Sequence, residues 1–188
     1  MPDLTGATIA FLATDGVEQT ELAGPWEAIK AAGANVHLLS NVDQVQGFDH
    51  LDKAQTFDVD RHVDAANPSV YDALVLPGGV ANPDQLRTDP QAVAFAKAML
   101  EGDKVVAAIC HAPWLLVEAD LVRGRQVTSW PSLKVDLSNA GASWLDQEVV
   151  VDEAGPGTLI TSRNPGDVPA FSAAVIDQVS ARRNVPSR

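Results

Sequence analysis

Short runs of apolar residues alternate along this chain with segments in which apolar residues recur every three or four positions. A continuous apolar run between turn residues is typical of a strand buried in a sheet, whereas the wider spacing is typical of a helix. The runs that predict strands are Thr8–Ala13, Asn35–Ser40, Asp72–Leu76, Val105–Ile109, Val127–Trp130, Glu148–Asp152 and Leu159–Ser162.

Helical spacing occurs between these runs. Leu22, Trp26 and Ile29 form the first apolar stripe, after a loop expected over residues 14–21. Asp89 and Asp167 are expected to cap the N-termini of two later helices, since aspartate accepts hydrogen bonds from the free N–H groups there. The later helices are predicted at residues 90–101, 113–119, 131–139 and 168–179.

The alternation of strands and helices predicts an α/β fold: a flavodoxin-like three-layer sandwich with a mostly parallel sheet between helices. We expect a single domain over residues 1–188, because no linker, repeat or low-complexity segment interrupts the pattern. The polar residues 41–68 are expected to hold a small side hairpin that includes residues 56–59. Ligands of such sheets bind at the carboxyl ends of the strands.

The net charge and the cysteine content limit which ligands the protein can bind and in which compartment it is expected. The formal net charge of −12 argues against binding of nucleic acid or an anionic membrane, which needs basic patches. The single cysteine excludes an internal disulfide and fits a reducing compartment. No signal peptide or apolar run of transmembrane length is evident, so we expect a cytoplasmic protein.

The single cysteine, Cys110, follows a buried strand and precedes a helix. This places it on a sharp strand-to-helix turn, similar to the turn that presents the nucleophile in α/β hydrolases. The positive end of the following helix is expected to favour the thiolate. The alternative is that Cys110 is a small residue of the hydrophobic core.

His111 and Glu18 are the candidate partners of the sulfur. His111 can act as a base, provided that the turn brings its side chain beside that of Cys110; alternatively it only tolerates the turn. Glu18 ends the first loop and can donate a hydrogen bond to a thiolate or an oxidised sulfur when it is protonated. Alternatively, Glu18 is an acid favoured by a helix N-terminus, a role for which Glu21 competes.

Gly78 and Gly79 follow the third strand and allow the backbone to approach a substrate closely. The N–H groups of Gly79 and His111 are candidate oxyanion donors, although two glycines also suit an ordinary turn. Asp84 can orient an imidazole or cap the segment around it. Trp114 and Trp130 are expected in the core or the pocket wall.

Other kinds of site lack their signatures. The histidines are His37, His50, His62 and His111, so none downstream of Cys110 can complete an amidotransferase-like or papain-like triad. No pair has zinc-motif spacing, and no dinucleotide fingerprint follows Gly78. We therefore expect no metal and no cofactor.

The sequence resembles the PfpI-like intracellular peptidase branch of the ThiJ/PfpI superfamily over nearly its whole length. The segments that carry the resemblance are residues 15–22, 73–79, 107–114, 121–125, 128–131, 139–141 and 161–167. The resemblance implies that Cys110 is the elbow cysteine, that His111 is its histidine and that Glu18 is the acid against the sulfur. It also implies that Asp84 completes a triad across a subunit interface.

Three features depart from the family pattern. Residues 80–82, before Asp84, are one residue longer than the corresponding segment of the archaeal members, so the match of Asp84 is looser. Ala112 replaces the glycine that usually follows the Cys-His pair, and the loop at residues 153–158 is longer than expected. The resemblance implies a homodimer or higher oligomer, with a small carbonyl compound or a peptide as substrate, and a stress-response hydrolase of peptidase or deglycase type. The alternatives are a non-enzymatic sensor in which Cys110 is oxidised, and a chaperone-like protein that does not need Cys110.

Overall fold

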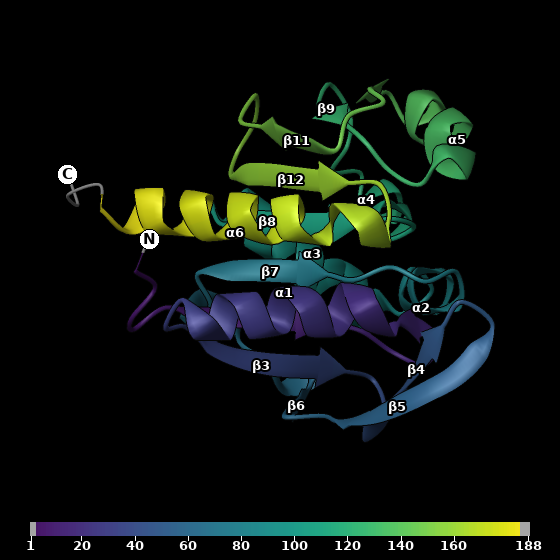
Figure 1. Ribbon diagram of the computed structural model, residues 1–188. Coiled ribbons are helices and arrows are strands. Elements are labelled where there is room, and N and C mark those ends of the chain that lie inside the picture. The colour runs from purple at the N-terminus through teal and green to yellow at the C-terminus, as the bar shows by residue number, and fades with distance from the viewer. Residues whose placement is uncertain (1–2, 185–188) are drawn as a thin grey trace.

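The computed structural model describes residues 3–184 and contains one large central sheet. Within these residues the sheet has seven strands, in the spatial order β11 (Val149–Asp152), β12 (Thr158–Ser162), β8 (Val105–Ile109), β7 (Ala73–Leu76), β1 (Thr8–Leu12), β3 (Asn35–Ser40) and β6 (Arg61–His62). All neighbouring strands pair in parallel except β11 and β12. The predicted mostly parallel sheet is therefore confirmed (Figure 1).

The direction of strand addition reverses beside β1. From β1 the chain passes outward to β3, and it then returns to β7 on the other side of β1 and continues to β8 and β12. In sheets of this type, the loops on either side of the reversal separate and leave a crevice at the carboxyl edge. The loops after β1, β7 and β8 meet at this edge.

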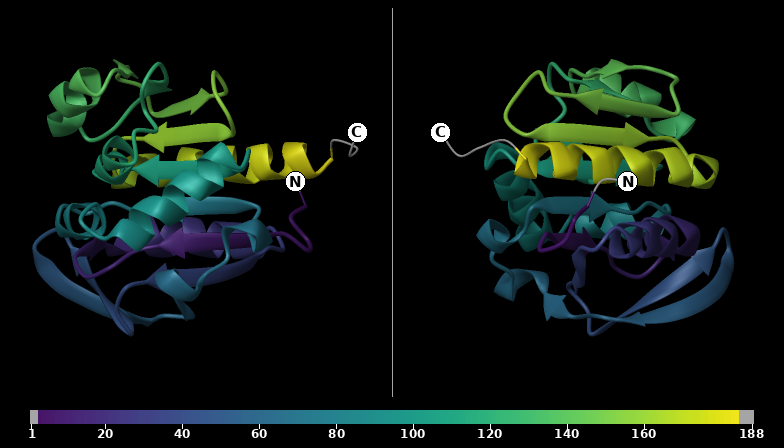
Figure 2. Two further views of the ribbon diagram at one scale, coloured as in Figure 1. Left: turned by 180° about the vertical axis from the view of Figure 1, so that it is seen from behind. Right: turned by 60° about the vertical axis from the view of Figure 1, so that its left-hand side comes forward.

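Helices cover both faces of the sheet. Helices α1 (Gln19–Ala31) and α6 (Val168–Arg183) lie together on one face, and α3 (Pro90–Glu101) and α4 (Pro113–Glu118) lie on the other (Figure 2). The short helices α2 (Ala81–Leu86) and α5 (Lys134–Asn139) lie outside these layers. The arrangement confirms the predicted three-layer α/β sandwich. Among the described residues, no helix is long and apolar enough to cross a membrane.

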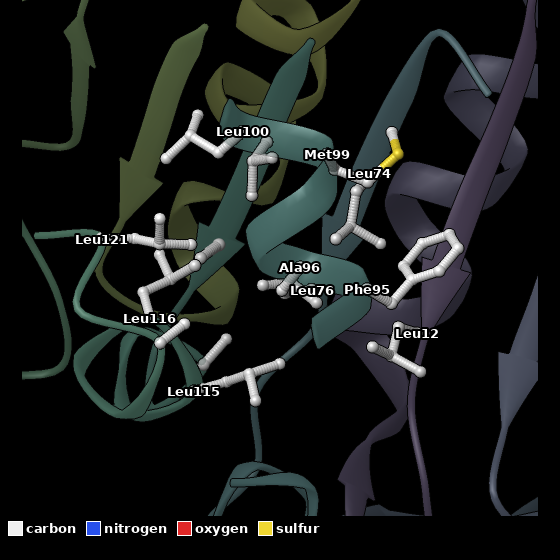
Figure 3. Packing of buried hydrophobic residues seen from close by; sticks show 14 of the residues in the cluster. Leu12, Leu74, Leu76, Phe95, Ala96, Met99, Leu100, Leu115, Leu116 and Leu121 are labelled. Carbon is white, nitrogen blue, oxygen red and sulfur yellow. The ribbon is translucent and has the colours of Figure 1, made fainter. Parts of the chain in front are cut away.

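Each face of the sheet has its own hydrophobic core. On the face of α3 and α4, leucines of the strands and helices interdigitate with Phe95 and Met99 (Figure 3). On the other face, Phe11, Phe171 and neighbouring aliphatic residues pack between the sheet, α1 and α6. Burial of each such large side chain contributes about 1.5–3 kcal/mol. The two cores fix the strands whose ends carry the site.

A side sheet extends beyond the carboxyl edge of the central sheet. It consists of β2 (Val17–Glu18), β4 (Gln44–Asp49) and β5 (Asp52–Asp58), with β4 and β5 forming an antiparallel hairpin. The expected side hairpin is therefore confirmed, but it is longer than residues 56–59. The hairpin places residues 48–51 beside the loop that follows β1.

Two predicted element boundaries were wrong. Residues 14–21 are not all loop, because β2 pairs with β4 and α1 already begins at Gln19. The strand predicted over Val127–Trp130 is reduced to β9 (Gln126–Val127), which pairs with β10 (Ser143–Trp144). The chain leaves this pairing because the Trp130 N–H donates to the Cys110 carbonyl at 2.9 Å. The residue at the end of the predicted strand thus forms a backbone hydrogen bond with the turn at Cys110.

The two predicted helix caps differ. Asp89 precedes α3, and its Oδ1 accepts a hydrogen bond from the Gln91 N–H at 2.9 Å, which confirms the predicted cap. Asp167 occupies the N-cap position of α6, but its carboxylate binds Arg163 at 2.9 Å and caps no N–H of the helix. The cap prediction for Asp167 was wrong because Arg163 offers a charge-assisted bond that competes for the carboxylate.

Replacing Asp89 by alanine is expected to lower the free energy of unfolding by about 1 kcal/mol, the usual effect of losing a helix cap. The loss of the bond from Asn41 Nδ2 to Asp89 Oδ2 adds to the same change. The matched control is Asp89→Asn, which keeps a capping oxygen and should stay close to the wild type. Chemical denaturation measures both variants; equal stability of Asp89→Ala and wild type would contradict the prediction.

The loop at residues 153–158 lies mostly on the surface, yet a buried ion pair holds its base. Arg125 Nη1 contacts Asp152 Oδ1 at 3.0 Å, and both side chains are 6% exposed. Arg125 Nη2 also donates to the Pro156 carbonyl inside the loop. Arg125 thus ties the loop to the end of β11.

Candidate functional site

The site centres on Cys110, which ends β8 and turns the chain sharply toward α4. Its φ of 63° lies in the left-handed region, which is strained for a residue other than glycine. Two backbone hydrogen bonds hold this conformation: the Cys110 N–H donates to the Ser162 carbonyl at 3.0 Å, and its carbonyl accepts from Trp130. Cys110 is therefore buried on an elbow, as the sequence predicts.

The turn brings His111 round to the sulfur. His111 Nδ1 lies 3.2 Å from Cys110 Sγ, although the two residues are adjacent in the chain. Burial lowers the pKa of His111, so its imidazole is neutral near pH 7. The Trp130 ring stacks on the imidazole with a centroid distance of 5.7 Å. A neutral, stacked imidazole next to a thiol is placed to accept the thiol proton.

The carboxyl group against the sulfur belongs to Glu21 rather than Glu18. Glu21 is fully buried, and its Oε2 accepts a hydrogen bond from the Gly78 N–H at 2.9 Å. A methyl group added to Gly78 would lie 2.4 Å from this oxygen and 2.7 Å from Cys110 Cβ, so both side chains flank the same point. The prediction for Glu18 missed this arrangement because α1 begins before Glu21 and turns its side chain inward.

Glu21 and Cys110 influence each other strongly. Burial raises the pKa of Glu21 to about 8, so the carboxyl group carries a proton at neutral pH. Burial, followed by the charge and contact of Glu21, raises the pKa of the Cys110 thiol above its usual range. From the sequence we expected the following helix to favour the thiolate and so to lower the pKa of Cys110; that prediction was wrong. The N–H groups of His111 and Gly79 do favour the thiolate, but they do not outweigh burial.

Glu18 lines the same pocket from β2. Its Oε2 accepts a hydrogen bond at 3.1 Å from the backbone N–H of His50, a residue at the tip of the β4–β5 hairpin. His50 has a φ of 54°, and its Nδ1 lies 3.9 Å from the same carboxylate oxygen. Glu18 and His50 thus connect the hairpin to the loop after β1.

The two predicted glycines have different roles. The Gly78 N–H is occupied by Glu21, whereas Gly79 lines the pocket and its N–H acts on the sulfur. Gly79 has a φ of 82°, and a Cβ there would lie 2.3 Å from the Gly16 carbonyl oxygen. Gly79 and His111 are therefore the backbone donors that face the reacting position. Their role as an oxyanion hole stays a prediction.

A cavity of about 460 Å³ opens over Cys110 and His111. Trp130 forms part of its wall and is 40% exposed. Trp114 does not line the cavity: it packs edge-on against His111 at a centroid distance of 5.4 Å, and its Nε1 donates to Asp136 at 2.9 Å. Trp114 thus packs against the imidazole, while its own N–H is bound to Asp136.

Asp84 lies on the exposed side of α2. Within residues 3–184 no hydrogen bond or ion pair joins it to His111, whose imidazole has Cys110 as its one hydrogen-bond partner among these residues. Any orienting role of Asp84 would therefore have to act on another copy of the chain. Among the described residues, no three histidine, cysteine, aspartate or glutamate side chains form a group that could hold a metal ion.

Sequence reasoning missed several pocket residues. Glu21 had a usable signal: with Pro25 and Ile29 it forms an i, i+4 row, and a carboxyl group in a buried helical row is unusual. The remaining residues come from the hairpin and from loops far apart in the chain, and no local pattern marks them. They are Gly16, Phe48, His50, Leu51, Val80, Ala81 and Pro165.

A doubly wound sheet with a cysteine elbow, an adjacent histidine and a buried acid defines a class of cysteine proteins. This chain belongs to the DJ-1/PfpI family, whose model matches residues 7–178. The resemblance inferred from the sequence is thereby confirmed.

Three similar proteins illustrate the family. General stress protein 18 of Bacillus subtilis is 42% identical over 169 residues, which cover 89% of this chain and 94% of that protein. Protein/nucleic acid deglycase 2 of Escherichia coli is 38% identical over 175 residues, covering 92% and 98%. A crystal structure from Anabaena variabilis, with DJ-1/ThiJ/PfpI-like and ferritin-like domains, has a TM-score of 0.86 and 36% identity; the match covers 96% of this chain and 50% of that one.

Proposed function

We propose that this protein is a stress-related cysteine hydrolase that acts on electrophilic carbonyl groups, as a deglycase or peptidase. The observation that carries the proposal is the juxtaposition of Cys110 Sγ, His111 Nδ1 at 3.2 Å and the protonated Glu21 at the base of an open cavity. The similarity to a stress protein and a deglycase supports the same class of reaction.

The residues divide the chemistry among them. The Cys110 sulfur attacks the carbonyl carbon while His111 takes the thiol proton, and the developing oxyanion is held by the N–H groups of Gly79 and His111. Protonated Glu21 can donate a hydrogen bond to the thiolate once it has formed, which offsets part of the burial that raises the pKa of Cys110. With a peptide, the amine departs with a proton and water hydrolyses the acyl-cysteine. With a methylglyoxal adduct, the amine or thiol departs with a proton and Cys110 captures the aldehyde as a hemithioacetal. Transfer of a proton from the aldehyde carbon to the ketone carbon converts this hemithioacetal to a lactoyl thioester, which water hydrolyses.

Asp84 enters this proposal only through a second copy of the chain. Its exposed position on α2 leaves it free to approach a neighbouring molecule, as the predicted homodimer requires. Val80, next to the start of α2, is 58% exposed at the cavity, and Leu51 on the hairpin is 93% exposed. These apolar side chains support a self-association that would complete the site.

Alkylation with iodoacetamide tests the proposal without a mutation, because Cys110 is the only cysteine. Turnover of methylglyoxal adducts and of unfolded peptides should fall in parallel with the uptake of one label per chain, since the label occupies the nucleophile. Mass spectrometry measures the label, and prior incubation with substrate should slow it. Full labelling with unchanged turnover would refute a hydrolase dependent on Cys110.

The same geometry supports a second candidate function. A protonated Glu21 and the N–H groups of Gly79 and His111 also suit the oxygens of a cysteine oxidised by peroxide. Cys110 would then act as an oxidation sensor rather than a nucleophile. A chaperone-like protein, by contrast, would protect unfolded clients whether or not Cys110 carries the label.

A further inference from the structure

The lining of the cavity over Cys110 contains acidic side chains but no lysine or arginine among the described residues. Among the described residues the lining includes two carboxyl groups, Glu18 and Glu21, but no lysine or arginine. Glu21 is protonated near neutral pH, which leaves Glu18 as the carboxylate that a ligand meets. The other titratable groups in the lining are His50, whose Nδ1 lies 3.9 Å from Glu18 Oε2, and Glu21, His111 and Cys110. Of the last three, Glu21 interacts with the charge of Glu18.

The carboxyl group of Glu18 is held in place by one hydrogen bond and keeps one oxygen without a partner among the described residues. Its side chain is only 9% exposed, and Oε2 accepts the His50 N–H. Oε1 accepts no hydrogen bond from any residue in the described part of the chain. The imidazole of His50 is 81% exposed and 3.9 Å from both Glu18 and Asp49, so solvent and a second carboxylate compete for it. Glu18 thus retains capacity to bind a cation.

We infer that Glu18 makes the site prefer substrates whose leaving group carries a positive charge over substrates whose leaving group carries a negative charge. This inference rests on the proposed function and names its substrate class. A cationic tail placed beside Glu18 gains a charge-assisted hydrogen bond in a largely apolar pocket. An anionic tail meets a carboxylate and no lysine or arginine among the described lining residues.

A series of hemithioacetals with one reacting group and three tail charges isolates this effect. Methylglyoxal is combined with 2-(dimethylamino)ethanethiol, whose tertiary amine cannot close a thiazolidine ring, with 2-mercaptoethanol or with 3-mercaptopropionate, giving tails of charge about +1, 0 and −1 at neutral pH. In each case water is consumed, the C–S bond breaks, and the products are the free thiol and lactate. The aldehyde carbon is oxidised while the ketone carbon is reduced, so no external oxidant takes part.

The expected order of kcat/KM is cationic, neutral, anionic, with about a tenfold to hundredfold range from one charge-assisted bond. The difference should appear mainly in KM, because the tail is bound equally in ground and transition states. In Glu18→Gln, which keeps an acceptor for the His50 N–H, the order should collapse, so that the three tails give similar values of kcat/KM. Added salt should weaken the preference in the wild type.

His50→Ala is the matched control, because it removes the imidazole but leaves the backbone N–H bond to Glu18. It should keep or strengthen the preference for the cationic tail. Equal rates for the three tails, or rates that follow only the free methylglyoxal concentration, would overturn the inference while leaving the proposed function intact. If the wild type processes none of them, and Cys110→Ala behaves identically, both fall.

Discussion

Replacing Cys110 by alanine is expected to lower kcat/KM for carbonyl adducts about a thousandfold or more, the usual consequence of losing a covalent nucleophile. The physical reason is that no other described side chain at the floor of the cavity can form the covalent intermediate. His111 is neutral and holds its Nδ1 toward the sulfur, and Glu21 keeps its proton near neutral pH. The initial rate of thiol or amine release measures the effect.

The control for this variant is Cys110→Ser, which preserves the size of the side chain and a possible hydrogen bond to His111. Both variants should fold, because the elbow is held by the backbone bonds of Cys110 to Ser162 and Trp130, which do not involve the sulfur. Serine should also be nearly inactive, since an alkoxide is far harder to form than a thiolate. Wild-type rates in folded Cys110→Ala would refute a hydrolase dependent on Cys110.

Replacing Glu21 by glutamine is expected to remove a large pH dependence of stability. Below pH 4.5 Glu21 is protonated in both the folded and the unfolded states. As pH rises from 4.5 to about 8, the unfolded chain releases the proton while the folded protein keeps it, so stability is lost across this window. The loss is on the order of 4 kcal/mol and ends once the folded state also ionises.

Glutamine cannot ionise, so Glu21→Gln should flatten this part of the profile and be the more stable protein near pH 8. Its carbonyl oxygen can still accept the Gly78 N–H, which limits structural change. Denaturation at several pH values measures the difference, with Glu18→Gln as the control carboxamide in the same pocket. A wild-type stability that does not fall between pH 5 and 8 would show that Glu21 is ionised in the folded protein.

Glu21→Gln also tests the role of Glu21 in the reaction. An amide N–H is a weaker hydrogen-bond donor to a thiolate than a carboxylic acid, so kcat should fall about tenfold to a hundredfold, the range of a weakened charge-assisted hydrogen bond. Glu21→Gln would therefore gain stability and lose activity together. This trade-off is typical of a buried group that is retained for function rather than for folding.

Much of the fold follows from local patterns. The apolar runs of β1, β3, β7, β8 and β12 predict buried parallel strands, because only strands covered on both faces are apolar throughout. Asp89 and Pro90 mark the start of α3 through the chemistry of the helix terminus. Elements shaped by distant contacts were less predictable: the chain after β9 leaves the strand conformation because Trp130 bonds Cys110.

The sequence by itself determined the elbow, the histidine beside its cysteine and the glycines opposite, because each depends on strand ends that adjoin in the sheet. Only the tertiary structure decided which acid serves the sulfur, since the first turn of α1 points Glu21 inward and leaves Glu18 to the hairpin. It also decided the protonation of the site. The burial that raises the pKa of Glu21 and of Cys110 comes from elements far apart in the chain, so no local pattern records it.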